Sequence, residues 1–525
     1  MRILIFHGYL LDGTGSNVYN ARLAAAFLAQ GHEVHLLSQD RHAEHQPFVD
    51  AVGDWDSGAL ELRALRSPVR CTVYRPNIGG LLPVYVADRY EGIEARTFAE
   101  CSDEQVAAYI DANVAAVREL VARVTPDIAL ANHLVMGPVI LARALGGVVP
   151  YAVKVHGSAL EYTVKPNPER FLGLAREGVD GASGILVGSH HTAASLWRAL
   201  ADPEIERRTR LGPPGVDVER FAPRPAREAT SAVERLARRL QADSPQPEQA
   251  EQAADGDVFA RDEHAAGAAL ASVHPDQDKL VVFVGKLIVS KGVDLLLAAW
   301  PLVLQEIPAA RLVVVGFGAY REAFEQLRGA LASGDMRRVR EIAQAGRSLE
   351  GASADPLPLR HLLAFFDALR GAELEQYLSA AETLEQRVVL SGRLNHEELA
   401  ELLPACEAIV VPSTFPEAFG MVAAEAAACG VLPVSAAHSG LAEVSETLAQ
   451  AVPAQLAPLL SFPVDDNAVR ALAACVSGWL TADEGLRERA REGLVRSVRE
   501  RWSWDGVARG VIAAARGELD GLQVP

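Results

Sequence analysis

The sequence predicts an α/β protein built from two doubly wound, Rossmann-like domains. Short apolar strands alternate with amphipathic helices in two series, one before residue 223 and one after residue 278. A segment rich in Ala, Glu, Gln, Asp and Pro separates the two series. The 525 residues are 49% hydrophobic and 22% charged, which fits a globular protein with two sizeable cores.

The first series opens with a strand over Arg2–His7, a glycine-containing turn, a helix from Ser16 to Gln30 and a strand over Glu33–Ser38. Gly13 and Gly15 in the turn could cradle a phosphate or another part of a substrate. A dinucleotide fingerprint requires a third glycine, where this chain has Val18, so the loop is a weak nicotinamide site. A plain tight turn explains the same residues.

The rest of the first domain repeats this pattern. We expect strands over residues 71–75, 127–131, 151–155 and 185–188, and helices over residues 104–123, 137–145 and 192–200. His156 directly follows one of these strands. Open parallel sheets bind ligands beyond the carboxyl ends of their strands, so His156 is a candidate ligand contact. A histidine bonded to neighbouring backbone is the alternative.

The predicted domain boundaries follow from composition. The first domain covers residues 1–223, and residues 224–277 form a low-complexity linker. A helix over 232–240 is compatible with the linker sequence, but the remainder is expected to be disordered because it has too few apolar residues to form a core. The second domain covers residues 278–499 and contains a helical insert over about residues 331–385.

Two lysines follow the first strand of the second series. The expected strands cover residues 280–284, 311–315, 387–390, 408–411 and 431–436, and Lys286 and Lys291 lie in the loop after the first of them. After the strand over 408–411, the chain enters a loop that ends at Gly420 and then an Ala-rich helix. A glycine at a helix start lets a ligand approach the backbone, whose free N–H groups favour anions.

Glu417 and Glu425 flank this helix start with the spacing E-x7-E. Carboxylates accept hydrogen bonds from sugar hydroxyls, and two ammonium groups can neutralise a diphosphate without a metal. The combination points to a ligand with phosphates at its centre and hydroxyls at both ends, which is the shape of a nucleotide sugar. Taken alone, the two glutamates are better explained by an ordinary βαβ unit, with Glu417 solvated and Glu425 on the surface.

Net charge and cysteine content limit the classes of partner and the cellular compartment that we expect. A net charge of −18 argues against nucleic acid, which requires a basic surface. The N-terminus reads as a strand instead of a signal peptide, and we expect no transmembrane segment. The five cysteines have no paired spacing and predict reduced thiols in a cytoplasmic protein. No metal site or cofactor is expected.

Seven motifs together resemble glycosyltransferase family 4, whose members have two Rossmann-like domains in the GT-B arrangement. In chain order they are GTGSN (13–17), VHG (155–157), PPGVDVERFAP (213–223), VGKLIVSKGVD (284–294), VVVGFG (313–318), SGRL (391–394) and FPEAFGMVAAEAAACG (415–430). They cover nearly the whole chain apart from the linker and the insert, and they are specific as a set.

The resemblance implies retaining transfer of a hexose-type sugar from a nucleotide-diphosphate sugar, with the domains facing a cleft. It assigns catalytic contacts to His156, Lys286, Lys291 and Glu417. It assigns donor contacts to Gly13, Gly15, Arg393, Leu394, Phe419, Gly420, Met421, Val422 and Glu425. It also implies that a C-terminal helix over about residues 500–525 packs back on the first domain. The family usually has Arg where this chain has Lys286, so a bidentate phosphate contact is lost.

Three other functions remain open at this point. A glycoside hydrolase would use Glu417 and Glu425 as its two carboxylates. A non-catalytic protein could bind the nucleotide sugar without turnover. A nicotinamide oxidoreductase would use the first loop, with Asp40 on a ribose. The sequence does not identify the base, the sugar or the acceptor, which could be a small molecule, a glycan or a lipid-linked compound.

Overall fold

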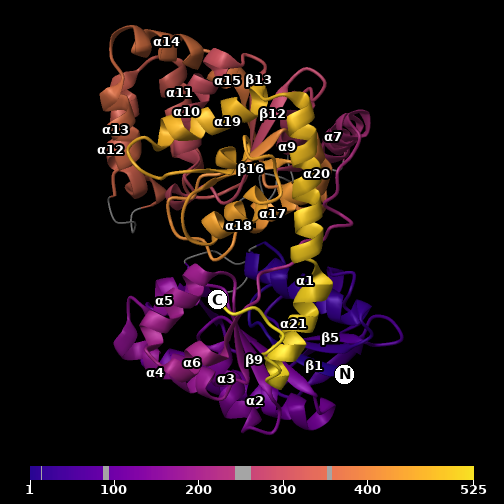
Figure 1. Ribbon diagram of the computed structural model, residues 1–525. Coiled ribbons are helices and arrows are strands. Elements are labelled where there is room, and N and C mark those ends of the chain that lie inside the picture. The colour runs from indigo at the N-terminus through magenta and orange to yellow at the C-terminus, as the bar shows by residue number, and fades with distance from the viewer. Residues whose placement is uncertain (14, 87–93, 243–261, 352–356) are drawn as a thin grey trace. The chain divides into compact units, whose positions relative to one another are not determined.

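The computed structural model describes residues 1–525 except 14, 87–93, 243–261 and 352–356. The chain forms two compact units, Met1–Gly215 with Trp502–Pro525, and Val216–Arg501. Each unit contains its own largely parallel sheet with helices around it, so the expected α/β fold with two parallel-sheet domains is confirmed (Figure 1). No helix among the described residues is long and apolar enough to cross a membrane.

The first unit is built on a sheet of nine strands in the order β11-β10-β9-β8-β1-β2-β5-β3-β4. All neighbouring strands pair in parallel except β3 and β4, which are antiparallel. The strands are β1 (Arg2–Phe6), β2 (Glu33–Leu37), β3 (Ala51–Asp54), β4 (Glu61–Ala64), β5 (Cys71–Arg75), β8 (Ile128–Asn132), β9 (Tyr151–Val155), β10 (Gly184–Val187) and β11 (Thr209–Leu211). A separate parallel pair consists of β6 (Leu81–Val84) and β7 (Glu94–Thr97).

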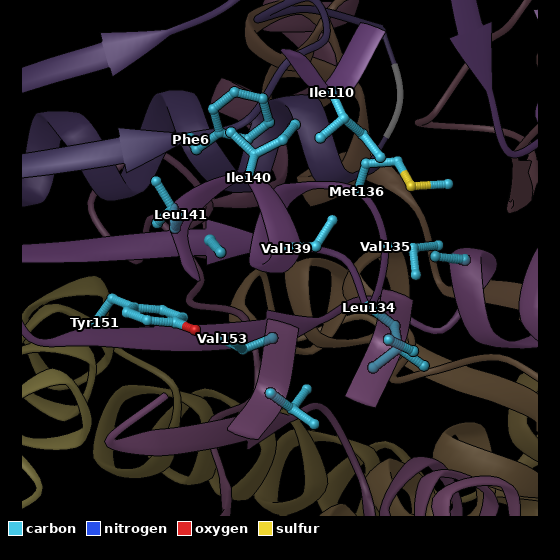
Figure 2. Packing of buried hydrophobic residues seen from close by; sticks show 14 of the residues in the cluster. Phe6, Ile110, Leu134, Val135, Met136, Val139, Ile140, Leu141, Tyr151 and Val153 are labelled. Carbon is cyan, nitrogen blue, oxygen red and sulfur yellow. The ribbon is translucent and has the colours of Figure 1, made fainter. Parts of the chain in front are cut away.

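Helices cover both faces of this sheet. They are α1 (Gly15–Ala29), α2 (Asp103–Val124), α3 (Gly137–Leu145), α4 (Pro168–Asp180), α5 (His190–Leu200), α6 (Pro203–Arg208) and α21 (Trp504–Arg516), with short turns of helix at η1 (Ala43–His45) and η2 (Leu160–Val164). One apolar cluster lies between the sheet and α2 to α5. Figure 2 shows part of it, where Phe6 and Val153 of the sheet lie among side chains of α2 and α3 and of the segment before α3. A second cluster lies on the opposite face, under α1 and α21.

The last helix completes the first unit. α21 packs on α1 and on strands β8, β9 and β10. The approach is close, because a Cβ atom on Gly184 would lie 2.8 Å from the carbonyl oxygen of Ala514. A Cβ atom on Gly215 would likewise lie 2.5 Å from the ring of Trp504. Small residues at these two positions therefore let the C-terminal segment seat on the sheet.

The second unit is built on a six-stranded parallel sheet in the order β14-β13-β12-β15-β16-β17. Its strands are β12 (Lys279–Val284), β13 (Ala310–Val315), β14 (Val388–Gly392), β15 (Ala408–Val411), β16 (Leu432–Ala436) and β17 (Ser461–Phe462). Its helices are α7 (Ala226–Ala242), α9 (Glu263–Ala271), α10 (Val293–Glu306), α11 (Arg321–Ala332), α12 (Met336–Ala345), α13 (Arg360–Ala368), α14 (Gly371–Ala381), α15 (Leu384–Arg387), α16 (His396–Leu402), α17 (Met421–Ala428), α18 (Ser439–Ala449), α19 (Ala468–Thr481) and α20 (Glu484–Arg501). Short 3-10 turns are η3 (Val289–Lys291), η4 (Gly346–Glu350), η5 (Leu403–Ala405) and η6 (Ala457–Leu460).

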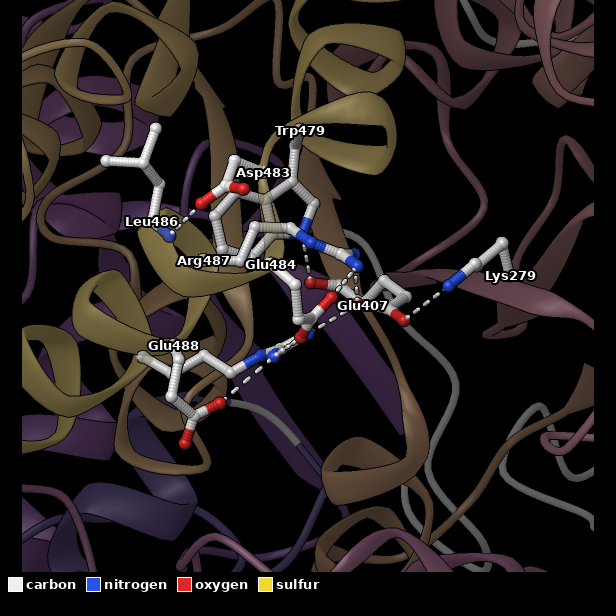
Figure 3. Close-up of polar contacts among 9 residues, drawn as sticks. Lys279, Glu407, Trp479, Asp483, Glu484, Leu486, Arg487 and Glu488 are labelled. Carbon is white, nitrogen blue, oxygen red and sulfur yellow. Dashed lines mark hydrogen bonds and ion pairs between the residues drawn. The ribbon is translucent and has the colours of Figure 1, made fainter.

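An ion-pair network fixes α19 and α20 to the start of β15 (Figure 3). The Glu407 carboxylate lies 3.1 Å from Arg487, 2.8 Å from Arg491 and 3.5 Å from Lys279. The indole N–H of Trp479 donates to the Glu407 carbonyl oxygen at 2.8 Å. Arg487 is only 7% exposed in its side chain, so its pairing offsets the cost of burying the charge.

Two parts of the predicted linker are helical. Residues 226–242 form α7 and residues 263–271 form α9, and the two helices pack against each other. The expectation of disorder is therefore wrong for residues 226–231, 241–242 and 263–271, while 243–261 lie outside the described residues. Gly267 explains the packing, because a Cβ there would lie 2.8 Å from the carbonyl oxygen of Ala237. The predicted insert contains helices α12 to α15.

Candidate functional site

The candidate site of the second unit lies where its strand order reverses, between β12 and β15. The loops that leave these two strands are in backbone contact, since the amide of Thr414 donates to the carbonyl oxygen of Ser290 at 2.9 Å. Gly292 has a φ of +66°, and a Cβ there would lie 2.0 Å from the carbonyl oxygen of Pro412. Only glycine fits this position. The contact brings the lysine loop and the glutamate loop together at the edge where open sheets bind ligands.

Lys291 and Glu417 meet at this edge. The Lys291 ammonium group pairs with Oε1 of Glu417, and Ser413 Oγ donates to the same oxygen at 2.6 Å. Burial alone would raise the pKa of Glu417, but Lys291, the Ser413 hydroxyl and His438 outweigh it and lower that pKa. The carboxylate is therefore ionised at neutral pH. Its side chain is 25% exposed, and no described residue bonds to its Oε2, which leaves that oxygen for a ligand.

The backbone of Glu417 is fixed by the loop after β16. Its amide donates to Ser439 Oγ at 2.9 Å, and its carbonyl oxygen accepts from the Gly440 amide at 3.0 Å. His438 holds the same loop, with Nε2 at 2.8 Å from the Ser413 carbonyl oxygen. Three loops, from β12, β15 and β16, thus position one carboxylate.

Helix α17 begins at the same place. Gly420 precedes it with a φ of +134°, which L side chains rarely adopt. The first N–H groups of a helix have no partner within it, so those of Met421 and Val422 are candidate anion donors. Phe419 is buried, and Met421 and Val422 are half-buried. This geometry suits a phosphate or a hydroxyl close to the backbone.

Glu425 occupies a different environment from Glu417. It lies in α17 with a side chain only 4% exposed, and its Oε1 is 3.2 Å from Nε2 of His396. His396 starts α16 behind a capping box in which the Asn395 side chain accepts from the amides of Glu397 and Glu398. Its ring packs edge-on against Phe221, with centroids 4.8 Å apart. The buried carboxylate is therefore held by an imidazole that the sequence did not reveal as its partner.

Three more of the predicted site residues follow strands β12 and β14, which β13 separates in the sheet. Lys286 follows β12 and is half-buried. Arg393 and Leu394 follow β14, and the Arg393 guanidinium lies 5.8 Å from the ring centre of Phe317. The amide of Val289 donates to the Glu350 carboxylate, so the helical insert holds the lysine loop.

In the first unit, three histidines gather at the carboxyl edge of the sheet. His7 follows β1, His133 follows β8 and His156 follows β9. The His133 ring centre lies 4.9 Å from that of His156 and 6.1 Å from that of His7. Burial is the main cause that lowers the pKa of His133 and of His156 well below the ordinary value. Nearby titratable groups lower it further: His7 for His133, and His133, Lys154 and His7 for His156. Burial lowers the pKa of His7 to about 4. All three rings are neutral at physiological pH.

His133 has no hydrogen-bond partner on either ring nitrogen and is only 2% exposed. Its φ of +67° lies in the left-handed region, which costs energy for a residue other than glycine. Lys154, on β9, is equally buried and donates to the Gly212 carbonyl oxygen. Burial lowers the pKa of Lys154 to about 7. Unpartnered or charged groups in a core indicate a functional constraint.

The glycine turn before α1 is exposed. Gly13 has a φ of +95° and Gly15 is the first residue of α1, while residue 14 lies outside the described residues. Asp40 does not point to a ribose site. Its two carboxylate oxygens accept from the amides of Leu11 at 3.0 Å and His42 at 2.8 Å, so it shapes the loop.

Within the residues that the structure describes, no three His, Cys, Asp or Glu side chains are grouped so that they could hold a metal ion. The five cysteines are buried and free. Sequence reasoning missed Asn132, His133 and Lys154 as part of this region. The sequence did carry a signal for them, because these polar residues interrupt the mostly apolar stretch over residues 128–155.

Three family models match the chain. One described as Glycosyltransferase Family 4 matches residues 13–220, and two described as Glycosyl transferases group 1 match residues 278–353 and 368–455. The first match lies within the first unit apart from its last residues, and the other two lie in the second unit.

Curated relatives are also glycosyltransferases. A D-inositol 3-phosphate glycosyltransferase of Segniliparus rotundus is 30% identical over 266 residues, which are 50% of this chain and 45% of the relative. One of the same name from Xylanimonas cellulosilytica is 27% identical over 68% of this chain and 63% of the relative. An uncharacterised glycosyltransferase of Methanocaldococcus jannaschii is 24% identical over 45% of this chain and 44% of the relative. The aligned part of the chain thus spans about half of these relatives.

Solved structures share the fold over nearly the full chain. Sucrose-phosphate synthase from Thermosynechococcus elongatus has a TM-score of 0.55 at 19% identity and covers 98% of both chains. Anabaena HepE in complex with UDP and glucose has a TM-score of 0.56 at 16% identity, covering 99% of this chain and 100% of HepE. At these identities the likeness concerns the fold alone.

Proposed function

Because this chain belongs to the glycosyltransferase family 4 type and has the GT-B fold, we propose that it transfers a hexose-type sugar from a nucleotide-diphosphate sugar to an acceptor hydroxyl. The observation that carries the proposal is the Lys291–Glu417–Ser413 contact beside the start of α17. It combines a cation, a helix N-terminus and an ionised carboxylate with one open oxygen. A diphosphate suits the first two and a sugar hydroxyl suits the third.

We infer the roles of the other residues from the family resemblance. Lys286 and Lys291 neutralise the diphosphate, and the backbone of Phe419–Val422 approaches the donor. Glu425 accepts hydrogen bonds from ribose hydroxyls, and Arg393 with Leu394 lies beside the base. In the first unit, His156 contacts the sugar, and the Gly13–Gly15 turn lies near phosphate or acceptor. No metal is required in this scheme.

We propose that the transfer retains the configuration of the sugar without a protein nucleophile. The bond between the anomeric carbon and the phosphate oxygen breaks, the acceptor oxygen bonds to the same face, and its proton passes to the departing phosphate. Lysines and a helix end that take up the developing charge remove the need for an acid on the leaving group. Oε1 of Glu417 already accepts two hydrogen bonds, which weakens it as a nucleophile.

The proposal is tested first by donor binding. We would compare thermal unfolding in the presence of UDP-, GDP-, ADP- and TDP-sugars, since a ligand that binds only the folded state raises the midpoint. UDP-glucose is the first candidate, because one structural neighbour, HepE, was solved with it. A midpoint that no nucleotide sugar raises would contradict the proposal.

Turnover then separates the competing functions. Inositol phosphates are the first acceptors to try, since two relatives are named for one. A product of the same anomeric configuration as the donor is expected, and Glu417→Gln should keep measurable activity. A protein that binds the donor but neither transfers nor hydrolyses its sugar would be a sensor. A protein that releases free sugar from a glycoside in the absence of any nucleotide would be a hydrolase. A sugar esterified to Glu417, or an inverted product, would refute the proposed mechanism.

A further inference from the structure

His156 forms a hydrogen bond through only one of its two ring nitrogens among the described residues. Its Nε2 lies 2.8 Å from Oδ1 of Asn132, and no described residue bonds to its Nδ1. The residue is half-buried, so the ring is neither sealed in the core nor free in solvent. Which nitrogen carries the proton decides whether Nδ1 donates or accepts a hydrogen bond.

The orientation of the Asn132 amide is fixed by a backbone group. Its Nδ2 donates to the carbonyl oxygen of Phe6 at 3.2 Å and to Oδ1 of Asn20 at 2.8 Å. A carbonyl oxygen only accepts, so Nδ2 must lie on that side and Oδ1 must face His156. Since Oδ1 also only accepts, the His156 Nε2 must carry the hydrogen.

The next groups along the network agree with this assignment. Asn20 Nδ2 donates to the Ser16 carbonyl oxygen at 2.8 Å, which leaves its Oδ1 to accept from Asn132. The same Nδ2 lies 3.1 Å from Nδ1 of His7, while Nε2 of His7 donates to the carbonyl oxygen of Leu10 at 2.9 Å. Each donor therefore meets an acceptor from the α1 backbone to His156. The side chains of Asn20 and Asn132 are at most 1% exposed, so water does not compete for them.

We propose that Asn132 is a positioning residue that holds His156 as the neutral Nε2–H tautomer, with the Nδ1 lone pair presented to a hydroxyl of the transferred sugar. The histidine thus accepts a hydrogen bond and adds no charge. Without Asn132, the ring would rotate or take the other tautomer, and Nδ1–H would meet the hydroxyl as a second donor. This inference rests on the proposed function for the identity of the ligand, but not for the tautomer.

The tautomer can be measured without substrate, from the ring nitrogen chemical shifts of protein labelled with ¹⁵N-histidine. His156→Gln identifies the His156 signals by their loss. We expect His156 in the parent protein to be neutral with its proton on Nε2 at pH 7.5. Asn132→Ala should populate the other tautomer, and Asn132→Asp should restore Nε2–H, because a carboxylate accepts the same hydrogen bond. The carboxylate should also raise the pKa of His156 and shift the pH profile of turnover.

Asn113→Ala is the matched control. Asn113 is equally buried in the first unit and donates to the Tyr109 carbonyl oxygen at 2.8 Å, but it has no hydrogen bond to a histidine. It should lower stability comparably and leave the His156 signals unchanged. An equal change in the His156 tautomer in Asn113→Ala would mean that reduced stability of the domain, and not loss of the Asn132–His156 hydrogen bond, causes the change.

Kinetics completes the test and separates the two proposals. Asn132→Ala should lower kcat tenfold or more, with a smaller effect on the donor KM. If transfer is found but the His156 tautomer does not respond to Asn132→Ala, the positioning role is wrong and the proposed function stands. If the tautomer responds but no donor is turned over, the positioning role stands and the proposed function fails. A parent protein with its proton on Nδ1 would overturn the inference directly.

Discussion

Replacing the buried lysine of β9 should change how stability depends on pH. Lys154 is only 2% exposed, and burial lowers its pKa from 10.5 to about 7. The ammonium form is therefore disfavoured in the fold. A shift of this size corresponds to roughly 5 kcal/mol of destabilisation when the lysine is charged in both the folded and the unfolded chain.

The direction in which stability changes with pH follows from the number of protons that the folded and the unfolded chain bind. Below pH 7 both states bind the proton, and the fold bears the full cost. Between pH 7 and about 10.5 the folded lysine has lost its proton while the unfolded chain still binds it, so stability rises with pH by up to about 1.4 kcal/mol per pH unit. Above that range both are neutral and the cost has gone. Lys154 thus contributes a rise in stability with pH above neutrality.

Lys154→Met removes this titration and keeps most of the apolar stem. It also leaves the carbonyl oxygen of Gly212 without its donor, at a cost of about 1–3 kcal/mol. We expect the variant to be more stable than the parent at pH 6, by about 2–4 kcal/mol, and less stable at pH 10. The two stability curves should therefore cross at alkaline pH.

The measurement is urea-induced unfolding of both proteins from pH 6 to pH 10. Lys154 also contributes to the lowered pKa of His156, but burial is the larger cause and keeps that ring neutral in the fold above pH 6, so the difference between the curves over this range reports Lys154. Lys165→Met, at a lysine whose side chain is 43% exposed, is the control for the same substitution at an exposed site. Parallel curves for Lys154→Met and the parent would refute the reasoning, because they would mean that the buried lysine does not titrate near neutrality.

Three further substitutions test the sites. Glu425→Ala should weaken donor binding, measured by calorimetry, by about 1–3 kcal/mol through lost charge-assisted hydrogen bonds. Glu397→Ala, at a glutamate whose side chain is 72% exposed, is the control and should leave donor affinity unchanged. Equal donor affinity in the two variants would contradict the ribose contact. Lys291→Ala should lower turnover more than Lys286→Ala, because it also removes the cation that pairs with the half-buried Glu417 carboxylate. Chelators should leave turnover largely intact, and loss of turnover that manganese restores would show a metal requirement. His133→Phe keeps a ring at this position and removes two unpartnered nitrogens, so the free energy of unfolding should not fall, although turnover should. A fall of more than about 1 kcal/mol in the free energy of unfolding would mean that the imidazole has a hydrogen-bond partner.

The apolar strands were predictable because each reads as a continuous buried run. The predicted strands over 71–75, 151–155 and 408–411 match β5, β9 and β15 to the residue. The sequence did not predict β4, whose four residues are all exposed, or β6, which contains Pro83. Such strands depend on a neighbour for their hydrogen bonds, so their own residues carry little signal.

Helix α9 shows how composition misleads. Its segment is rich in Ala and surrounded by polar sequence, which reads as disorder. Ala266 and Leu270 are nevertheless buried, because Gly267 lets the helix approach α7 closely. A helix with small side chains gains burial only from a partner that fits it. That fit is a property of the pair and is absent from the sequence of either helix.

The glutamate site shows the same limit in its chemistry. The sequence located Glu417, Glu425, Lys286 and Lys291 on strand ends and helix starts, which is the part that chain order determines. It did not reveal that Lys291 pairs with Glu417, because that contact depends on the β12 and β15 loops meeting at Gly292. The pairing bears on the proposed function, in which a bound phosphate shares Lys291 with the carboxylate.

The carboxyl edges of the two sheets, each taken by itself, differ in charge. The edge of the first unit presents imidazoles that burial keeps neutral, so it offers hydrogen bonds without a net charge. The edge of the second unit carries Lys286, Lys291, Arg393 and an ionised Glu417, so it offers charges for a diphosphate. Under the proposed function, a neutral His156 adds no positive charge that would attract the leaving phosphate. Under the proposed function, Lys286 and Lys291 are therefore the groups that take up the negative charge of the departing diphosphate.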